Sequence, residues 1–249
     1  LVSSEMCIRD STGSYAELLA VDERIVGRKP RNLSFAEAAA LPLVSLTAWE
    51  ALFEQLAIDP LGAPHPILIV GGAGGVGSVA TQIARRVAGL HVVATASRPE
   101  SSAYARRMGA DDLIDHTLDF APQVQALGLP GFDYIFSTAS LANFGQLVSV
   151  LNPLGKICVI LAGPEAQALD VSGLMRIRGT LTWELMFTRP AAGVEMERQG
   201  RILNRVADLV EQGVLVSTMT QQHSWREVQA VHRQIATVHT VGKIVLTID

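Results

Sequence analysis

The chain has 249 residues, of which 49% are hydrophobic and 18% are charged, and its formal net charge is −4. A chain of this length can bury a large core, as one large domain or two modest ones. The mildly acidic balance, without a basic stripe, argues against a nucleic-acid-binding protein. Cys7 and Cys158 lie far apart, which argues against a disulfide framework or a cysteine-rich metal site. We expect a soluble cytoplasmic protein in which Cys158, within an apolar run, is a core residue.

The first fifth of the chain predicts an unstructured start and then two helices. Residues 1–12 show no clear periodicity, so we expect them to be non-native or disordered. Ser34 and Glu37 have the spacing of a capping box, which predicts the start of an alanine-rich helix that Pro42 closes. A second helix is expected over residues 45–55.

Five glycines within residues 71–77 separate two apolar segments. Residues 67–70 are Ile-Leu-Ile-Val, which is the pattern of a strand that is buried on both faces. After the glycines, apolar residues recur at the spacing of one helix face: Val76, Val79, Ala80, Ile83, Ala84 and Val87. We therefore expect a strand-to-helix turn, in which Gly72, Gly74 and Gly77 fit the G-x-G-x-x-G pattern of dinucleotide-binding proteins.

In such a turn the glycines let the backbone approach a pyrophosphate, which meets the unpaired N–H groups at the positive end of the helix. Two other interpretations of this segment remain. One is a glycine-rich turn in a sheet protein that binds no nucleotide. The other is a membrane span, because residues 66–84 carry no charge, although the five glycines argue against a membrane helix.

The rest of the chain alternates between strand-like and helix-like segments. Strands are expected at residues 91–96, 111–115, 132–136, 156–163, 178–185 and 242–248. Helices are expected at residues 101–108, 144–150, about 202–210, and after a second capping pair, Ser224 and Glu227. Residues 151–155, Leu-Asn-Pro-Leu-Gly, are interpreted as a helix stop and a turn. The alternation predicts an α/β fold with a doubly wound parallel sheet of the Rossmann type, whose ligands bind at the carboxyl ends of the strands.

The end of the second expected strand bears on the choice of dinucleotide. Proteins that prefer NAD commonly carry Asp or Glu at this place, to bind the ribose 2′-hydroxyl. Here residues 95–99 are Thr-Ala-Ser-Arg-Pro, without an acid. Ser97 and Arg98 offer a hydroxyl and a guanidinium group, which suit a 2′-phosphate and favour NADPH. The alternative is that Arg98 is an ordinary solvated loop arginine.

Several segments in combination resemble the medium-chain dehydrogenase/reductase superfamily. They are DERIVGRKPRNLSFAEAAALPLVSLTAWEALF, LIVGGAGGVGSVATQIAR, TASRPES, MGADDLIDH and WELMFTR. The closest resemblance is to the quinone-oxidoreductase branch and, within it, to the bacterial zinc-type alcohol dehydrogenase-like proteins. It extends from about Gly13 to the C-terminus. The resemblance implies a β-rich, GroES-like catalytic domain that precedes the nucleotide-binding domain, with most of that first domain missing here.

The resemblance also implies a division of the chain. Residues 13–42 are expected to be a remnant of the GroES-like domain, residues 43–221 the NADP-binding Rossmann domain, and residues 222–249 a return to the catalytic domain. We expect a homodimer in the full-length form. From residues 1–249 alone we expect NADPH binding with little activity.

The same resemblance implies a set of cofactor-binding residues. Thr47 matches a threonine beside the nicotinamide, and the alternative is that it is only a hydroxyl near a helix start. The pyrophosphate turn is matched by Gly74, Gly75 and Val76, and the 2′-phosphate contact by Ser97 and Arg98. The positions that line the crevice are matched by Thr138, Ala162 and Phe187.

Zinc is not expected, in spite of the name of the group. Zinc alcohol dehydrogenases carry a ligand cysteine where this chain has Leu43, and a catalytic zinc takes three protein ligands. The reaction that the resemblance implies is hydride transfer from NADPH to a small-molecule substrate, a quinone or a conjugated carbonyl compound, and no general acid is identified. A zinc-type alcohol dehydrogenase and a non-catalytic NADPH-binding protein remain as alternatives.

Overall fold

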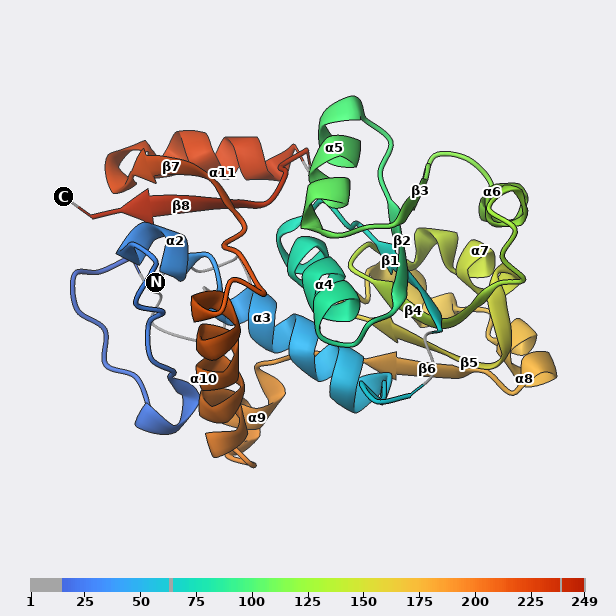
Figure 1. Cartoon of the computed structure of the whole chain (residues 1–249), viewed down its shortest axis with the longest axis horizontal. Coiled ribbons are helices and arrows are strands. Elements are labelled where there is room, and N and C mark those ends of the chain that lie inside the picture. The colour runs from blue at the N-terminus through green and yellow to red at the C-terminus, as the bar shows by residue number, and fades with distance from the viewer. Residues whose placement is uncertain (1–14, 63–64, 238, 249) are drawn as a thin grey trace. The chain divides into compact units, whose positions relative to one another are not determined.

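The computed structural model describes residues 15–62, 65–237 and 239–248. The chain divides into two compact units, of which one is Thr47–Leu185 and the other combines Leu1–Leu46 with Met186–Asp249 (Figure 1). The expectation for residues 1–12 lies outside the described residues. The domain division expected at residues 43 and 221 depends on the architecture of a longer protein and stays a prediction.

The unit Thr47–Leu185 is built on a six-stranded sheet in which every neighbouring pair of strands is parallel. Its spatial order is β3-β2-β1-β4-β5-β6. The strands are β1 (Pro66–Val70), β2 (His91–Thr95), β3 (Asp112–Ile114), β4 (Phe132–Ser137), β5 (Leu151–Val159) and β6 (Thr180–Trp183). Because the order reverses between β1 and β4, this is the predicted doubly wound α/β fold, and its switch point lies beside the glycine turn.

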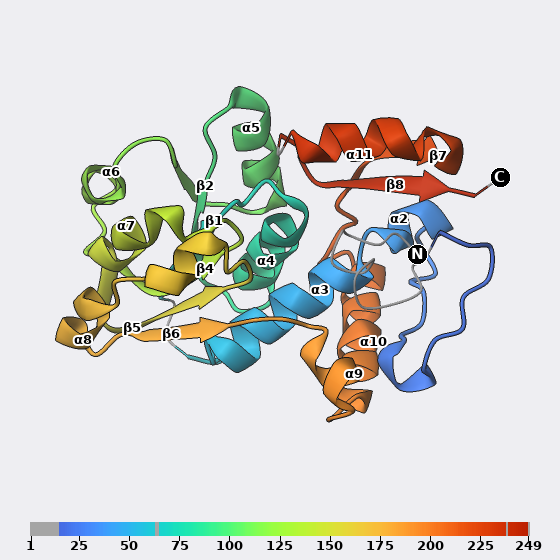
Figure 2. The ribbon, with the colours of Figure 1, turned by 180° about the vertical axis from the view of Figure 1, so that it is seen from behind.

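Helices cover both faces of this sheet (Figures 1 and 2). Helices α4 (Gly75–Arg86) and α5 (Pro99–Met108) pack against one another, and α4 also packs on β1 and β2. The opposite face carries α6 (Phe120–Ala126), α7 (Phe144–Ser149) and α8 (Ser172–Ile177), with the short 3-10 helices η3 (Leu141–Asn143) and η4 (Pro164–Ala168). A π-helical segment, η2 (Glu50–Gln55), contacts β5 and β6.

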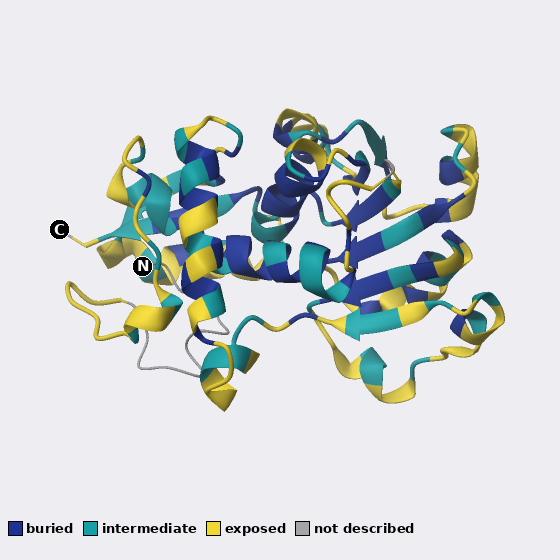
Figure 3. Ribbon diagram, turned by 60° about the horizontal axis from the view of Figure 1, so that its bottom comes forward, coloured by how far each residue is buried: buried dark blue, intermediate teal, exposed yellow. Residues whose placement is uncertain are grey.

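The core follows from the alternation of side chains along the strands. Leu68 and Val70 of β1 lie in one cluster with Phe120, Leu147 and Leu174 from α6, α7 and α8. The intervening strand residues face the other layer, so β1 is apolar on both sides, as its uncharged sequence predicts. Figure 3 shows buried residues both in the strands of this sheet and in helices. The glycine-containing segment is thus a strand and a helix rather than a membrane span.

The prediction of a turn at residues 151–155 is wrong, because these residues belong to β5. Leu151 pairs with Phe132 of β4, and the pairing then resumes at Lys156 opposite Tyr134. The extra residues of β5 form an irregularity in the ladder, within which Leu154 adopts a φ of 66°. Residues typical of a turn are tolerated here because a bulge leaves them unpaired.

The role expected for Pro42 is also wrong. Helix α2 (Phe35–Ala39) begins at the predicted Ser34–Glu37 capping box and ends before Pro42, which is the first residue of α3 (Pro42–Trp49). Proline suits this position because the first residue of a helix has no partner for its N–H. Helices α6 and α8 were not expected from the sequence.

The second unit contains α2, the helices α9 (Thr188–Ala192), α10 (Glu197–Glu211) and α11 (Val228–Ala236), and two 3-10 turns, η1 (Glu23–Ile25) and η5 (Trp225–Glu227). Its two strands, β7 (Met219–Ser224) and β8 (Lys243–Thr247), pair in parallel. Strand β8 was predicted and the polar strand β7 was not. The helical run Phe35–Gln55 is long and apolar enough to cross a membrane by length and composition alone, a test that buried core helices also pass.

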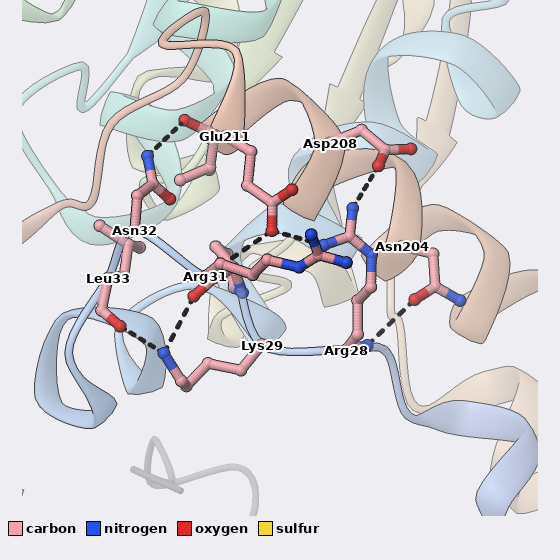
Figure 4. A network of polar contacts seen from close by, with 10 residues as sticks. Arg28, Lys29, Arg31, Asn32, Leu33, Asn204, Asp208 and Glu211 are labelled. Carbon is pink, nitrogen blue, oxygen red and sulfur yellow. Dashed lines mark hydrogen bonds and ion pairs between the residues drawn. The ribbon is translucent and has the colours of Figure 1, made fainter.

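The segment 27–33 lies along α10 and is held there by polar contacts (Figure 4). Arg28 forms ion pairs with Asp208 and with Glu211, the latter at 2.6 Å. The same Glu211 carboxylate accepts the Arg31 N–H at 2.9 Å. These contacts attach a segment without regular structure to a long amphipathic helix.

Candidate dinucleotide-binding site

The glycine turn follows β1 at the carboxyl edge of the six-stranded sheet and leads into α4. The Gly74 N–H donates to the Gly71 carbonyl at 2.9 Å, which closes the turn. A Cβ on Gly77 would lie 2.1 Å from the Gly71 oxygen, and a Cβ on Gly72 would lie 2.6 Å from the Cβ of Ala94 on β2. Only glycine therefore allows α4 to approach the turn and the turn to approach β2 this closely.

The first turn of α4 presents backbone N–H groups that have no partner within the helix. Its N-cap is Gly74, which makes no side-chain capping bond, and Ser78 is the first residue whose N–H bonds back along the helix, to the Gly74 carbonyl at 2.9 Å. The preceding N–H groups of Gly75, Val76 and Gly77 lie at the positive end of a twelve-residue helix. An arrangement of this kind can bind a phosphate or another anion.

Ser97 and Arg98 follow β2, the strand next to β1, and so lie at the same edge of the sheet as the glycine turn. Ser97 is exposed and Arg98 is half-buried. Arg98 is the N-cap of α5, where the Ser101 hydroxyl accepts its N–H at 3.2 Å and donates to its carbonyl at 2.9 Å. The backbone that carries the guanidinium group is therefore fixed by a buried serine.

Thr138 comes directly after β4, the strand on the other side of β1. Its hydroxyl and its N–H both donate to the Val70 carbonyl, at 2.9 and 3.1 Å. On the opposite side, the Gly71 N–H donates to the hydroxyl of Thr95 at 2.9 Å. Thr95 was missed by the sequence analysis, although a hydroxyl residue at the end of the strand next to the glycine turn is a usable signal.

The three remaining predicted residues lie on separate elements. Thr47 is a buried residue of α3, with 5% of its surface exposed, and Ala162 is exposed after the end of β5. Phe187 belongs to the other compact unit, where it is the half-buried N-cap of α9. Their roles at a nicotinamide or in a crevice stay predictions.

Two groups that could serve acid or nucleophilic chemistry are unsuited to it. Cys158 is buried in the core, as predicted. Burial, and secondarily the carboxylate of Glu184, raises the pKa of its thiol far above the ordinary value, so the thiol stays protonated. Burial raises the pKa of Tyr134 as well, with the carboxylates of Asp133 and Asp59 adding to the effect. Tyr134 lies within β4 rather than at its carboxyl end, so it is not placed to protonate a substrate there.

Comparisons with known proteins place the chain in a family. A family model described as zinc-binding dehydrogenase matches residues 108–246. A zinc-type alcohol dehydrogenase-like protein of Staphylococcus aureus (strain MSSA476) is 36% identical over 244 residues, which is 95% of this chain and 72% of the relative. The chain belongs to the medium-chain dehydrogenase/reductase superfamily. The members of this superfamily are oxidoreductases. The six-stranded unit has the Rossmann-type α/β fold of the superfamily.

Solved structures and a second relative extend the comparison of this medium-chain dehydrogenase/reductase. One solved structure is that of a Rhizobium etli CFN 42 protein whose name describes it as a zinc-dependent alcohol dehydrogenase. It has a TM-score of 0.85 at 44% identity, and the match covers 91% of this chain and 67% of that protein. An NAD-dependent alcohol dehydrogenase has a TM-score of 0.83 at 27% identity, with 95% and 66% covered. The 2-methylene-furan-3-one reductase of Solanum lycopersicum is 47% identical over 105 residues, 42% of this chain and 26% of the reductase.

The printed names of several relatives refer to zinc, which the sequence analysis does not expect in this chain. Within residues 15–62, 65–237 and 239–248, no three or more His, Cys, Asp or Glu side chains are grouped so that they could hold a metal ion. The half-buried Leu43 stands at the position of the ligand cysteine that the resemblance implies. That this medium-chain dehydrogenase/reductase works without zinc stays a prediction.

Proposed function

We propose that this medium-chain oxidoreductase is an NADPH-dependent reductase that transfers hydride to a quinone or a conjugated carbonyl compound without zinc. The observation that carries the proposal is the edge formed by β1 and β2. A helix N-terminus without a side-chain cap follows one strand, and a serine and an arginine follow the other.

The residues at this edge suit both phosphate-bearing parts of NADPH, the diphosphate and the 2′-phosphate. The N–H groups of Gly75, Val76 and Gly77 would hold the diphosphate, because they lie at the positive end of α4 and have no partner within the helix. Arg98, with Ser97 beside it, would hold the 2′-phosphate through charge-assisted hydrogen bonds. When bound, the cofactor supplies the hydride, and the protein orients it and limits the access of water.

The proposed substrate class is supported by the names of relatives and not by a pocket of this chain. The Solanum lycopersicum relative is named as a reductase of a methylene-furanone, which is a conjugated carbonyl compound. Leu43, which cannot ligate a metal, favours a reaction without zinc. A zinc-type alcohol dehydrogenase is the second candidate, and the names of the Staphylococcus aureus relative and of the matching family favour it. The cytoplasmic location and the homodimer stay predictions.

The proposal is tested first by titrating the chain with NADPH and with NADH. The full-length form is then assayed with a panel of quinones, enones and alcohols, with and without a zinc chelator. We expect tighter binding of NADPH, and turnover of quinones or enones that a chelator does not change. Chelator-sensitive oxidation of alcohols, with no turnover of quinones or enones, would show a zinc-type alcohol dehydrogenase. Binding of NADPH without hydride transfer to any acceptor would show a non-catalytic binding protein.

A further inference from the structure

The peptide group between Val70 and Gly71 is held from both sides by threonine hydroxyls. On the β2 side, the Oγ1 of Thr95 accepts the Gly71 N–H at 2.9 Å. On the β4 side, the Oγ1 of Thr138 donates to the Val70 carbonyl at 2.9 Å, and its N–H donates to the same oxygen at 3.1 Å. Both strands are direct neighbours of β1.

These contacts lie where the regular pairing of the sheet ends. The last paired residues are Ile69 with Ala94 on one side and Val70 with Ser137 on the other. The chain then turns at Gly71, which adopts a φ of 82°. The two threonines, one at the end of each neighbouring strand, hydrogen-bond the next peptide group after the paired residues of β1. They thereby extend the contact between β1 and its neighbours into the glycine turn.

Gly71 in turn determines where the anion-binding N–H groups of α4 lie. Its carbonyl accepts the Gly74 N–H at 2.9 Å, and its oxygen is in close contact with Gly77 in the first turn of the helix. A Cβ on Gly71 would lie 2.3 Å from the Thr138 hydroxyl, so this hydroxyl packs directly on the turn. A shift of the Val70–Gly71 peptide would therefore move the whole phosphate-binding turn.

We infer that Thr95 and Thr138, the threonine pair, are positioning residues that set the place of the pyrophosphate-binding turn. Thr95 is 3% exposed, so its hydroxyl accepts the Gly71 N–H inside the protein and can act without touching the cofactor. For Thr138 this role differs from the predicted crevice contact, since its hydroxyl hydrogen is directed to Val70. The inference rests on the proposed binding of a dinucleotide.

The test compares Thr95→Val, which keeps the shape and removes the acceptor, with Thr95→Ser, which keeps the hydroxyl. Thr180→Val is the matched control, because it makes the same change at an exposed position of β6. Three ligands are titrated: NADPH, ADP, which has a diphosphate but no nicotinamide, and adenosine 2′-monophosphate, which has no diphosphate. The unfolding temperature of each variant is measured in parallel.

In Thr95→Val we expect the affinities for NADPH and ADP to fall roughly tenfold, while the affinity for adenosine 2′-monophosphate stays within about twofold. Thr95→Ser and Thr180→Val should bind like the wild type. Thr138→Val should show the same ligand pattern with a smaller loss, because its N–H still reaches Val70. It therefore provides a second test if Thr95→Val does not fold.

Three results would overturn the inference. The first is an unchanged NADPH affinity in both valine variants. The second is an equal loss for all three ligands, since a merely structural role would not depend on the diphosphate. The third is a wild-type chain that binds none of the ligands, which would overturn the proposed function and this inference with it. The first two leave the proposed function intact.

Discussion

A Cβ atom on Gly77 would lie 2.1 Å from the carbonyl oxygen of Gly71, six residues earlier in the chain. It would also lie 2.7 Å from the Gly71 carbonyl carbon and 3.0 Å from the Cα of Gly72. All three neighbours are backbone atoms, so no side chain can turn aside to make room. The first turn of α4 thus rests on the backbone of the glycine turn.

Gly77→Ala is expected to remove NADPH binding and to lower the free energy of unfolding. The methyl group forces the helix away from the turn, and overpacking of this kind costs about 1–3 kcal/mol. Gly145→Ala is the control, because Gly145 lies in α7 with no atom within 4 Å of an added Cβ. Alanine there should leave NADPH binding unchanged and stabilise the chain by up to about 1 kcal/mol. Urea unfolding and NADPH titration measure both effects, and normal binding by Gly77→Ala would contradict the assigned site.

Arg98→Ala is expected to weaken NADPH binding far more than NADH binding. A charge-assisted contact to the 2′-phosphate is worth about 1.5–3 kcal/mol, or roughly ten- to a hundredfold in affinity. Arg107→Ala is the matched control, because it removes the same charge from the last turn of the same helix, α5. Both variants are titrated with both cofactors. Equal losses for NADPH and NADH in Arg98→Ala, or no loss at all, would remove the assignment of NADPH.

Glu211→Gln is expected to destabilise the chain at neutral pH and to have less effect in acid. The Arg31 N–H and the Arg28 guanidinium hold the pKa of Glu211 below its ordinary value in the folded chain (Figure 4). A carboxylate with a lowered folded-state pKa stabilises the fold above its unfolded pKa of about 4.3, and this contribution disappears as the pH falls through the folded value.

The measurement is urea unfolding of the wild type and Glu211→Gln between about pH 7 and pH 3. The difference in the free energy of unfolding should be largest at pH 7 and shrink below about pH 5. It should also decrease in high salt, because the Glu211 side chain is partly exposed to solvent. A difference that does not change with pH would mean that the shape of Glu211, and not its charge, attaches the segment 27–33 to α10.

Cys158 is expected to resist alkylation while the chain is folded. Its side chain is buried in β5, and burial keeps the thiol protonated, whereas the thiolate is the reactive form. At pH 8, iodoacetamide should modify Cys158 at least roughly a hundredfold more slowly in buffer than in denaturing urea. Mass spectrometry of the peptide that contains Cys158 separates its reaction from that of Cys7. Similar rates in the two conditions would show that β5 is not part of a stable core.

Much of the candidate site was predictable from the sequence, because its signals are local. A buried strand, a run of glycines and an amphipathic helix follow one another within residues 67–86, and each is specified by its own residue pattern. The Ser34–Glu37 capping box was predictable for the same reason, since its two hydrogen bonds join residues three positions apart. The location of Ser97 and Arg98 at the carboxyl edge of the sheet was predictable because they come soon after a strand of a parallel sheet.

Features that depend on pairing between distant segments were decided only by the tertiary structure. Residues 151–155 have the composition of a turn, yet they become part of β5 because the strand pairs with β4 at Leu151 and again from Lys156 onward. The polar residues of β7 have no strand pattern of their own and are extended because they pair with β8, whose Ile244 and Val245 are buried. The contact between Thr95 and Gly71 joins residues 24 positions apart. Composition and periodicity report the preferences of a segment, whereas a hydrogen bond between two strands depends on a register that only the folded sheet establishes.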